Sequence, residues 1–233
     1  MPNTTAHPAA SRTRQALTRT RAAIAACAIA LVPGTALAHP HVWVSVEATV
    51  LYDKGTVIGL AHKWTFDEMY TAMAIQGLDT NNDGVYDRNE LAELAQVNID
   101  GLKEFDYFTF AKLGQSPLPF APPRDYWLEH SNGVLSLHMV TPLAQPVLAE
   151  AEGLSFSIYD PSYFIAFDLA KTDPVRLSEG APAGCAASIG EPLENSELAQ
   201  RLGDAFKEQL GGGNAAALGI GVTKSIMLSC PKS

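Results

Sequence analysis

The stretch with the most evident chemistry is DTNNDGVYDRNE, residues 79–90, in which oxygen-bearing side chains recur along a short loop. A cation of calcium's size needs about seven oxygen ligands at roughly 2.4 Å, and a twelve-residue loop can offer them from positions 1, 3, 5, 7, 9 and 12. Position 6 needs a residue that accepts a positive φ. The residues at these positions are all of the required type: Asp79, Asn81, Asp83, Gly84, Val85 through its carbonyl, Asp87 and Glu90. The loop therefore predicts calcium binding.

Helix-forming patterns flank this loop. Apolar residues follow helical spacing in DEMYTAMAIQGL before it and in ELAELAQVNIDGL after it. A metal loop between two helices is the arrangement of an EF-hand, which we place at about residues 67–102. Tyr86 occupies position 8, where an aliphatic residue usually pairs with a second loop, and the sequence offers no second loop. We therefore expect weak binding, with a dissociation constant of roughly 10⁻⁴ M or looser, that holds the two helices together.

Residues 1–38 have the order of a secretory signal. Four arginines precede the apolar run AAIAACAIALV, which is about eleven residues long and shorter than the roughly 20 residues of a membrane span. Ala36 and Ala38 then stand at the small-residue positions of a signal-peptidase site. We expect a signal peptide at 1–38 and a single periplasmic domain at 39–233. The alternative is a retained membrane anchor.

Cleavage after Ala38 would leave a second set of metal-binding groups at the new N-terminus. His39 would offer its α-amine and its imidazole, and His41 would offer another imidazole. Nitrogen donors of this kind suit zinc, nickel or copper, with His62 or a carboxylate such as Asp67 completing the site. The competing interpretation is that histidines at the start of a strand are simply solvated.

The chain is acidic, with 16 Lys and Arg against 25 Asp and Glu and a net charge of −9. Without the four arginines of residues 1–38 the balance is 12 − 25 = −13. Such a surface repels nucleic acid and attracts cations. The expected partners are therefore metal ions, together with a membrane metal permease if the protein serves a transporter, and not nucleic acid.

Two cysteines, Cys185 and Cys230, remain once Cys27 leaves with the predicted signal. A pair of cysteines in an exported chain favours a disulfide over a metal site. Their separation of 45 residues implies a contribution of about 4 kcal/mol in the chain-entropy model. No second apolar segment reaches membrane-spanning length, so no span is expected after cleavage.

Strand patterns dominate the rest of the chain. Alternation in residues 41–53 and 56–66 predicts an opening hairpin. Further strand-length runs lie at 106–113, 124–130, 134–143, 154–160, 162–170 and 224–230. The proline-rich QSPLPFAPP reads as a loop, and NSELAQRLGDAFKEQL predicts a helix. We predict an α+β fold: an antiparallel β-sheet or sandwich with an inserted helix–EF-hand loop–helix lobe and a C-terminal helix. Whether the strands form one sheet or two stays open.

Catalytic motifs are not evident in the sequence. It has no GxSxG elbow, no HExxH helix and no phosphate-binding glycine loop. Asp160 lies between Tyr159 and Tyr163, where it could serve an active site, but an Asp-Pro turn explains it more economically. We therefore expect no enzymatic activity and assign no catalytic residues.

Four segments carry a family resemblance: AHPHVWV, KWTFDEMY, EFDYFTF and SIYDPSYFIAF. Together they resemble the uncharacterised periplasmic proteins of domain-of-unknown-function family 1007, often labelled as the periplasmic component of an uncharacterised ABC-type transport system. The likeness runs from about His39 to Leu169. It implies export and a link to transition-metal handling, because relatives tend to be encoded near nickel, cobalt or zinc transport genes. It implies no demonstrated activity.

Two functions follow from these observations. The first is a periplasmic calcium-binding protein that acts as an accessory or substrate-binding component of a nickel, cobalt or zinc transport system. The second is a structural or partner-binding module of the cell envelope that uses calcium only for rigidity.

Overall fold

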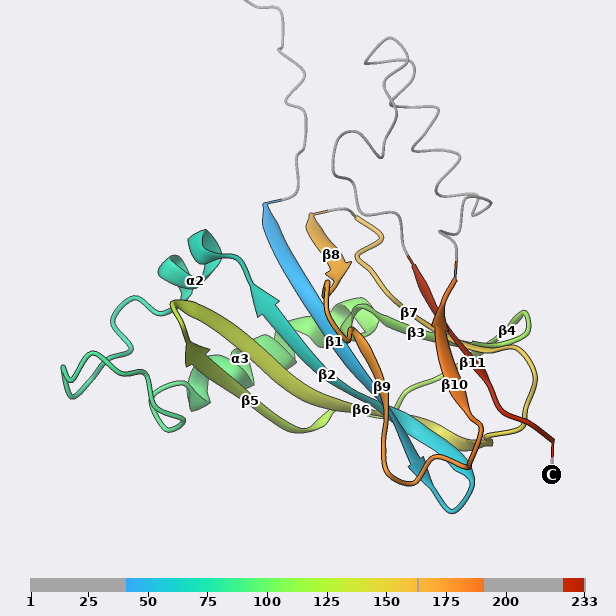
Figure 1. Ribbon diagram of the computed structural model, residues 1–233. Coiled ribbons are helices and arrows are strands. Elements are labelled where there is room, and N and C mark those ends of the chain that lie inside the picture. Colours follow the sequence, from blue (N-terminus) through green and yellow to red (C-terminus); the bar gives the residue numbers. More distant parts are fainter. Residues whose placement is uncertain (1–40, 163, 191–223, 233) are drawn as a thin grey trace, which may run out of the picture. The chain divides into compact units, whose positions relative to one another are not determined.

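Figure 1 shows the computed structural model of the chain, which describes residues 41–162, 164–190 and 224–232. These residues begin with a long hairpin of β1 (Val42–Asp53) and β2 (Thr56–Phe66). Buried and accessible residues alternate along both strands, because successive side chains of a strand point to opposite faces of the sheet. The predicted opening hairpin is confirmed.

Within the described chain the hairpin lies in the middle of a six-stranded sheet, here called sheet A, with the order β5-β6-β2-β1-β8 and with β9 also paired to β1. Its remaining strands are β5 (Arg124–Ser131), β6 (Val134–Leu148), β8 (Ile165–Leu169) and β9 (Val175–Leu177). The pairs β1–β2, β2–β6 and β5–β6 are antiparallel, whereas β8 and β9 both run parallel to β1. The strand β1 therefore joins segments that are far apart in the sequence.

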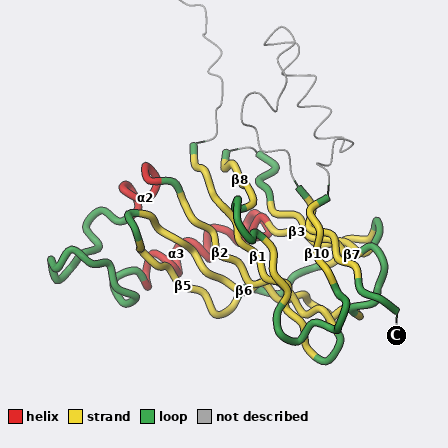
Figure 2. Tube along the Cα trace, in the orientation of Figure 1, coloured by secondary structure: helices red, strands yellow, loops and turns green. Residues whose placement is uncertain are grey.

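A second sheet of five described strands, sheet B, has the order β10-β11-β7-β3-β4 (Figure 2). Its strands are β3 (Thr109–Leu113), β4 (Ser116–Leu118), β7 (Leu154–Ile158), β10 (Ala186–Ile189) and β11 (Ser225–Ser229). All of its pairings are antiparallel. The strands thus form two sheets, which the sequence had left open.

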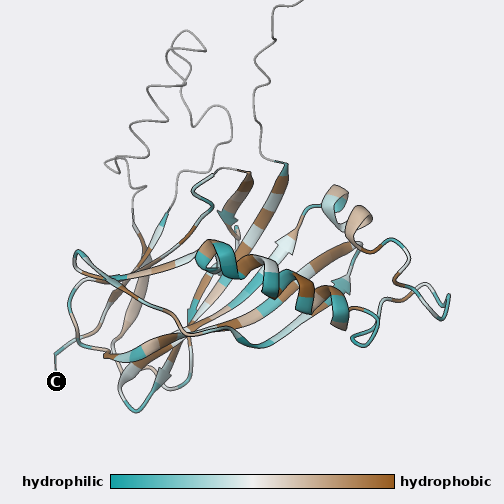
Figure 3. Ribbon diagram, turned by 180° about the vertical axis from the view of Figure 1, so that it is seen from behind, coloured by the Kyte–Doolittle hydropathy of each residue, from teal (hydrophilic) through white to brown (hydrophobic). Residues whose placement is uncertain are grey.

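The core is built from one face of each sheet and from one helix. Sheet A contributes side chains such as Val46, Trp64 and Leu137, and sheet B contributes Phe156 and Ile226, all of them fully buried. Helix α3 (Ala92–Leu102) lies across the back of sheet A, as Figure 3 shows, and places Ala95 and Ile99 in the same cluster. The opposite face of sheet A carries no helix among the described residues.

The fold is mostly β, so the predicted α+β class with an inserted helical lobe is wrong. Helix α2 (Glu68–Ala74) has seven residues and packs on β6, and α3 packs on β5. The backbone N–H of Leu135 donates to the hydroxyl of Thr71 at 3.0 Å, which ties α2 to the sheet. Each helix packs on the sheet, because helices of seven and eleven residues are too short to be stable without tertiary contacts. The predicted C-terminal helix, at 195–210, lies outside the described residues, as does segment 1–38.

Several strand boundaries also differ from the prediction, and two of the differences have a clear physical reason. QSPLPFAPP was predicted as a loop, yet it contains the edge strand β4, in which Pro117 faces Lys112; an edge strand tolerates proline because it needs fewer ladder bonds. The run at 106–113 becomes a strand only at Thr109, because the residues before it have left-handed backbone with φ of 51°, 52° and 47°: Asp106, Tyr107 and Phe108. That turn, which ends the 3₁₀ segment η1 (Lys103–Phe108), redirects the chain from α3 into β3.

The predicted disulfide between Cys185 and Cys230 is present. Cys185 precedes β10 and Cys230 follows β11, and the neighbouring residues Ala186 and Ser229 are paired in the sheet. A disulfide is consistent with an extracytoplasmic protein, because thiols stay reduced in the cytosol. In the described residues, no helix has the length and apolarity to cross a membrane.

His62 is the most unusual buried polar side chain. It projects into the core from β2, 4% exposed, and its Nε2 lies 2.8 Å from the Thr141 hydroxyl. Its Nδ1 has no hydrogen-bond partner. Burial lowers the pKa of His62 from the usual 6.5 to about 3. The imidazole is therefore neutral in the folded protein over the whole physiological range.

Removing the disulfide should destabilise the protein strongly. In a Cys185→Ser/Cys230→Ser double variant we expect the free energy of unfolding to fall by about 4 kcal/mol, because the unfolded chain regains the entropy of an open loop. Denaturant unfolding of both proteins measures this loss. Reductant should destabilise the wild type by a similar amount and leave the double variant unchanged; equal midpoints for the two proteins without reductant would contradict the prediction.

Stability should depend on the protonation of His62. Between its folded pKa of about 3 and its unfolded value of 6.5, only the unfolded state binds the proton, so stability is lost as the pH falls through this window. Between pH 7.5 and 5 this term amounts to about 2 kcal/mol. A His62→Gln variant keeps an acceptor and donor near Thr141 but does not titrate. Its unfolding free energy should fall by about 2 kcal/mol less over this range; an unchanged pH dependence would refute the assignment.

Candidate functional site

The loop 79–90, which connects α2 to α3, is folded around its own acidic side chains. Asp79 accepts hydrogen bonds from the backbone N–H of Asp83 at 3.1 Å and from that of Gly84 at 3.0 Å, one on each oxygen. The amide oxygen of Asn81 accepts from Asp83 N–H at 2.8 Å, and Asp83 accepts from Val85 N–H at 2.8 Å. Gly84 has a φ of 79°, which glycine adopts without strain. These bonds turn the side chains of positions 1, 3 and 5 toward the inside of the loop.

Glu90 closes the loop from its other end. One carboxylate oxygen accepts from the backbone N–H of Thr80 at 2.8 Å and from its hydroxyl at 2.9 Å, and the other accepts from Asp87 N–H at 3.1 Å. These bonds, led by the one from the Asp87 backbone, lower the pKa of Glu90 because they favour the charged form. Asp87 in turn accepts from the N–H groups of Asn89 and Glu90. Hydrogen bonds from Thr80 and Asp87 therefore keep Glu90, at position 12, in its charged form and fix its place in the loop.

The donor set of the loop fits a hard divalent cation in its chemistry. It comprises four carboxylates, one side-chain amide and one backbone carbonyl: Asp79, Asp83, Asp87, Glu90, Asn81 and Val85. A carboxylate oxygen that accepts one N–H bond still has a lone pair for a metal. In the part of the chain that the structure describes, however, no three His, Cys, Asp or Glu side chains are grouped closely enough to hold a metal. The residue types of the loop suit such an ion, but its side chains would have to turn further inward to coordinate one.

Two side chains of the loop contact sheet A. The ring of Tyr86 meets the ring of His130 on β5 edge-on, with centroids 4.9 Å apart. The guanidinium of Arg88 lies 4.5 Å from the ring centroid of Trp127, also on β5. Tyr86, which departs from the usual aliphatic residue at position 8, therefore has a role of its own: it joins the loop to the sheet.

The predicted transition-metal residues are only partly brought together. His39 lies outside the described residues. His41 is exposed, its N–H donates to the Phe164 carbonyl at 2.9 Å, and its ring is 4.9 Å from the ring of Phe164. Asp67 lies beside Trp43, two residues from His41, but both of its oxygens already accept hydrogen bonds: one from Trp43 N–H at 2.9 Å and one from Tyr70 N–H at 2.8 Å, where it caps α2.

His62 cannot complete a metal site with His41. It is paired with Ala48 on β1, seven residues along the strand from His41, or about 23 Å at 3.3 Å per residue. Its ring is also enclosed in the core. The suggestion that His62 supplies a further ligand is therefore wrong, because the strand alternation that buries Trp64 buries His62 as well.

Asp160 has a structural role. It is 4% exposed, and it accepts hydrogen bonds from the N–H and hydroxyl of Ser162, both at 2.7 Å, and from the N–H of Ile165 at 2.9 Å. These bonds close the turn that leads into β8. The turn interpretation accounts for this residue, while Tyr163 lies outside the described residues.

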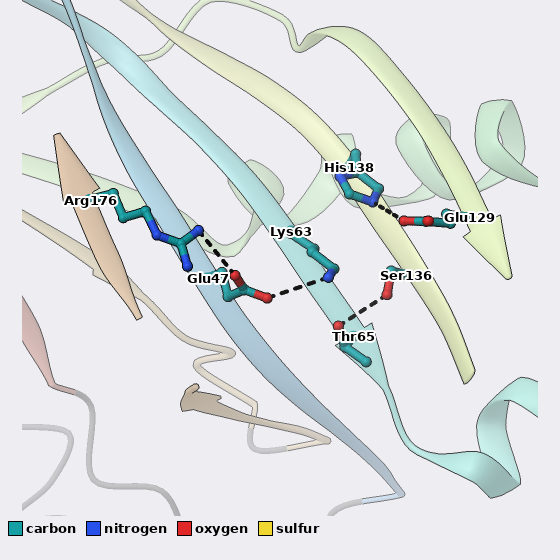
Figure 4. Close-up of polar contacts among 7 residues, drawn as sticks. All are labelled: Glu47, Lys63, Thr65, Glu129, Ser136, His138 and Arg176. Carbon is teal, nitrogen blue, oxygen red and sulfur yellow. Dashed lines mark hydrogen bonds and ion pairs between the residues drawn. The ribbon is translucent and has the colours of Figure 1, made fainter. Parts of the chain in front are cut away.

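A row of polar side chains on the uncovered face of sheet A was not predicted. It crosses four strands in the order Trp127, His138, Lys63 and Glu47. Arg176 on β9 is paired with Thr49, and its side chain reaches back to Glu47; Figure 4 shows all of these residues but Trp127 and Thr49. Glu47 pairs with Lys63 at 3.5 Å and with Arg176 at 3.4 Å, and His138 contacts Glu129 at 3.0 Å. The alternation of the strands was enough to predict that Glu47 and Lys63 lie on the polar face. That His138 and Arg176 are their neighbours depends on the strand order, which the sequence does not show.

Comparison with known proteins places the chain among uncharacterised relatives. It is 24% identical over 195 residues to an uncharacterised protein of Haemophilus influenzae, covering 83% of this chain and 92% of that protein. It is 29% identical over 99 residues to an uncharacterised 15.5 kDa protein of Spirochaeta aurantia, covering 42% of this chain and 70% of that one. The profile of one family, described as "Protein of unknown function (DUF1007)", matches residues 24–230. The chain therefore belongs to the DUF1007 family, as its sequence motifs indicated.

Proposed function

We propose that the protein is a periplasmic calcium-binding protein whose ion is held by the loop 79–90. The observation that carries this proposal is the inward folding of the loop on its own N–H groups, with Glu90 closing it from position 12. Four carboxylates within twelve residues repel one another, and a divalent cation removes that repulsion. Periplasmic location is supported by the disulfide and by the signal-like order of residues 1–38.

Calcium would act on more than the loop. The ligand residues would come from the segment between α2 and α3, and the same segment contacts β5 through Tyr86 and Arg88. An ion that fixes the loop would therefore fix both helix ends and one edge of sheet A. The loop is largely exposed and its contacts to β5 are few, so a bound ion would add to the hydrogen bonds that already order it.

We further propose that the protein serves a transition-metal transport system as an accessory or binding component. The exposure of His41 at the start of β1 supports this role, since its imidazole is accessible there. The family resemblance, which implies a link to transition-metal handling, supports the same role. The alternative, a structural module that uses calcium only for rigidity, is favoured because the described residues of the histidine end do not bring three His, Cys, Asp or Glu side chains together.

Calcium should stabilise the protein. With a dissociation constant of about 10⁻⁴ M, 10 mM Ca²⁺ should raise the free energy of unfolding by about 2.7 kcal/mol, measured as a rise in Tm over protein in chelator. Glu90→Gln should abolish the rise, because it removes the charge and the bidentate ligand at position 12. Asp53→Asn, at an exposed carboxylate outside the loop, is the matched control and should keep it. If 10 mM Ca²⁺ leaves the Tm of the wild type unchanged, the calcium proposal is wrong.

Transition-metal binding should depend on the processed N-terminus. In titration calorimetry of the mature protein we expect zinc, nickel or copper to bind with a dissociation constant of about 10 µM or tighter, roughly −7 kcal/mol. His41→Ala and a form extended by one alanine before His39 should each weaken binding at least tenfold. Binding weaker than 10 µM for all three metals supports the structural module instead, and unchanged affinity in the extended form excludes the terminal amine.

A further inference from the structure

A shallow hollow of about 200 Å³ lies on the uncovered face of sheet A. Its floor is a row of three small side chains that face one another across the middle of the sheet: Thr49 on β1, Ala61 on β2 and Val140 on β6. The next row of the same face, two residues further along each strand, carries the long side chains of Glu47, Lys63 and His138. The hollow exists because a row of short residues adjoins a row of long ones.

The two ends of the hollow are closed by different groups. Arg176 on β9 pairs with Thr49 and stands at one end. Trp127 and Asp125 on β5 stand at the other. With strands about 4.8 Å apart, the floor between these ends is three strands wide. A hollow of about 200 Å³ has room for a small organic molecule.

The charge in this hollow is unlike that of the rest of the protein. Glu47 pairs with both Lys63 and Arg176, and Asp125, the other carboxylate that lines the hollow, pairs with Arg124 at 3.8 Å. Three cations and two carboxylates leave one positive charge over, in a chain of net charge −9. Lysine has three N–H donors and arginine has five; Arg176 donates one of its own to Glu47, and Lys63 forms an ion pair with the same carboxylate. The remaining donors lie beside the hollow, on side chains that are 40% and 55% exposed. This arrangement is complementary to an anion.

The wall at the Trp127 end is held in place before any ligand arrives. The rings of Trp127 and His138 are parallel within 3°, with centroids 4.5 Å apart, so His138 covers one face of the indole. The guanidinium of Arg88 lies over the same ring at 4.5 Å and must occupy the other face. His138 is in turn fixed by Glu129. A site whose wall is already fixed loses less entropy on binding.

We propose that this hollow binds a small organic acid. The carboxylate of the ligand takes the free donors of Lys63 and Arg176, while its hydrocarbon part lies on Ala61 and Val140. Glu47 acts as a positioning residue: its carboxylate lies between Lys63 and Arg176 and fixes the positions of both cations. Of the residues named for this site, only Arg88, which packs on Trp127, belongs to the calcium loop, and none belongs to the histidine end. The contacts proposed for the ligand itself involve neither metal.

The proposal can be tested with succinate as the probe, in chelator so that calcium plays no part. Titration calorimetry of the wild type should give a dissociation constant of about 1 mM or tighter. Lys63→Gln and Arg176→Gln should each weaken binding at least tenfold, because each removes a donor and a positive charge. Lys112→Gln, at an exposed lysine on sheet B, is the matched control and should leave the affinity unchanged.

Two further arms make the result decisive. Ala61→Leu fills the floor without changing charge and should also weaken succinate binding at least tenfold, with a circular-dichroism spectrum and Tm near those of the wild type. Sulfate, an anion without a hydrocarbon part, should bind at least tenfold more weakly than succinate. The proposal is overturned if wild-type succinate binding is weaker than 10 mM, if the Lys63 and Arg176 variants bind as the wild type does, or if sulfate binds equally well.

Discussion

The register of the β1–β2 hairpin is the constraint on which the rest of the structure depends. Because side chains alternate strictly, the pairing of Val46 with Trp64 sends one set of residues into the core and leaves Glu47 and Lys63 on the open face. A slip of one residue would exchange the two faces. The same register buries His62, places Asp67 at the start of α2, and sets the rows of long and short side chains on the open face.

Features that depend on local sequence could be predicted. The hairpin followed from alternation over 41–53 and 56–66, and the disulfide followed from the two cysteines left after residue 38. The turn at Asp160 followed from the Asp-Pro dipeptide. In each case the physical cause lies within a few residues of the feature or, for the disulfide, in the scarcity of alternative partners.

Features that depend on contacts between distant segments could not be predicted. Lys63 and His138 are neighbours only because β2 pairs with β6, and Arg88 reaches Trp127 only because α3 packs on β5. The strands β9 and β10 have three and four residues, too few for a periodic pattern. The helical patterns beside the loop were correctly located, but they did not show that the helices would pack into a predominantly β core.

The parallel pairing of β1 with β8 affects how the chain is made. The hairpin closes in about 1–10 µs once its residues are available, but β8 begins at Ile165, 165 − 53 = 112 residues after the end of β1. At about 5–20 residues per second, roughly 6–22 s pass before that partner is synthesised. During this interval one edge of β1 has its backbone N–H and C=O groups open to strands of other molecules. Arrival of the later segment at the place of folding, and not closure of the hairpin, therefore sets the earliest time at which this edge of β1 is covered.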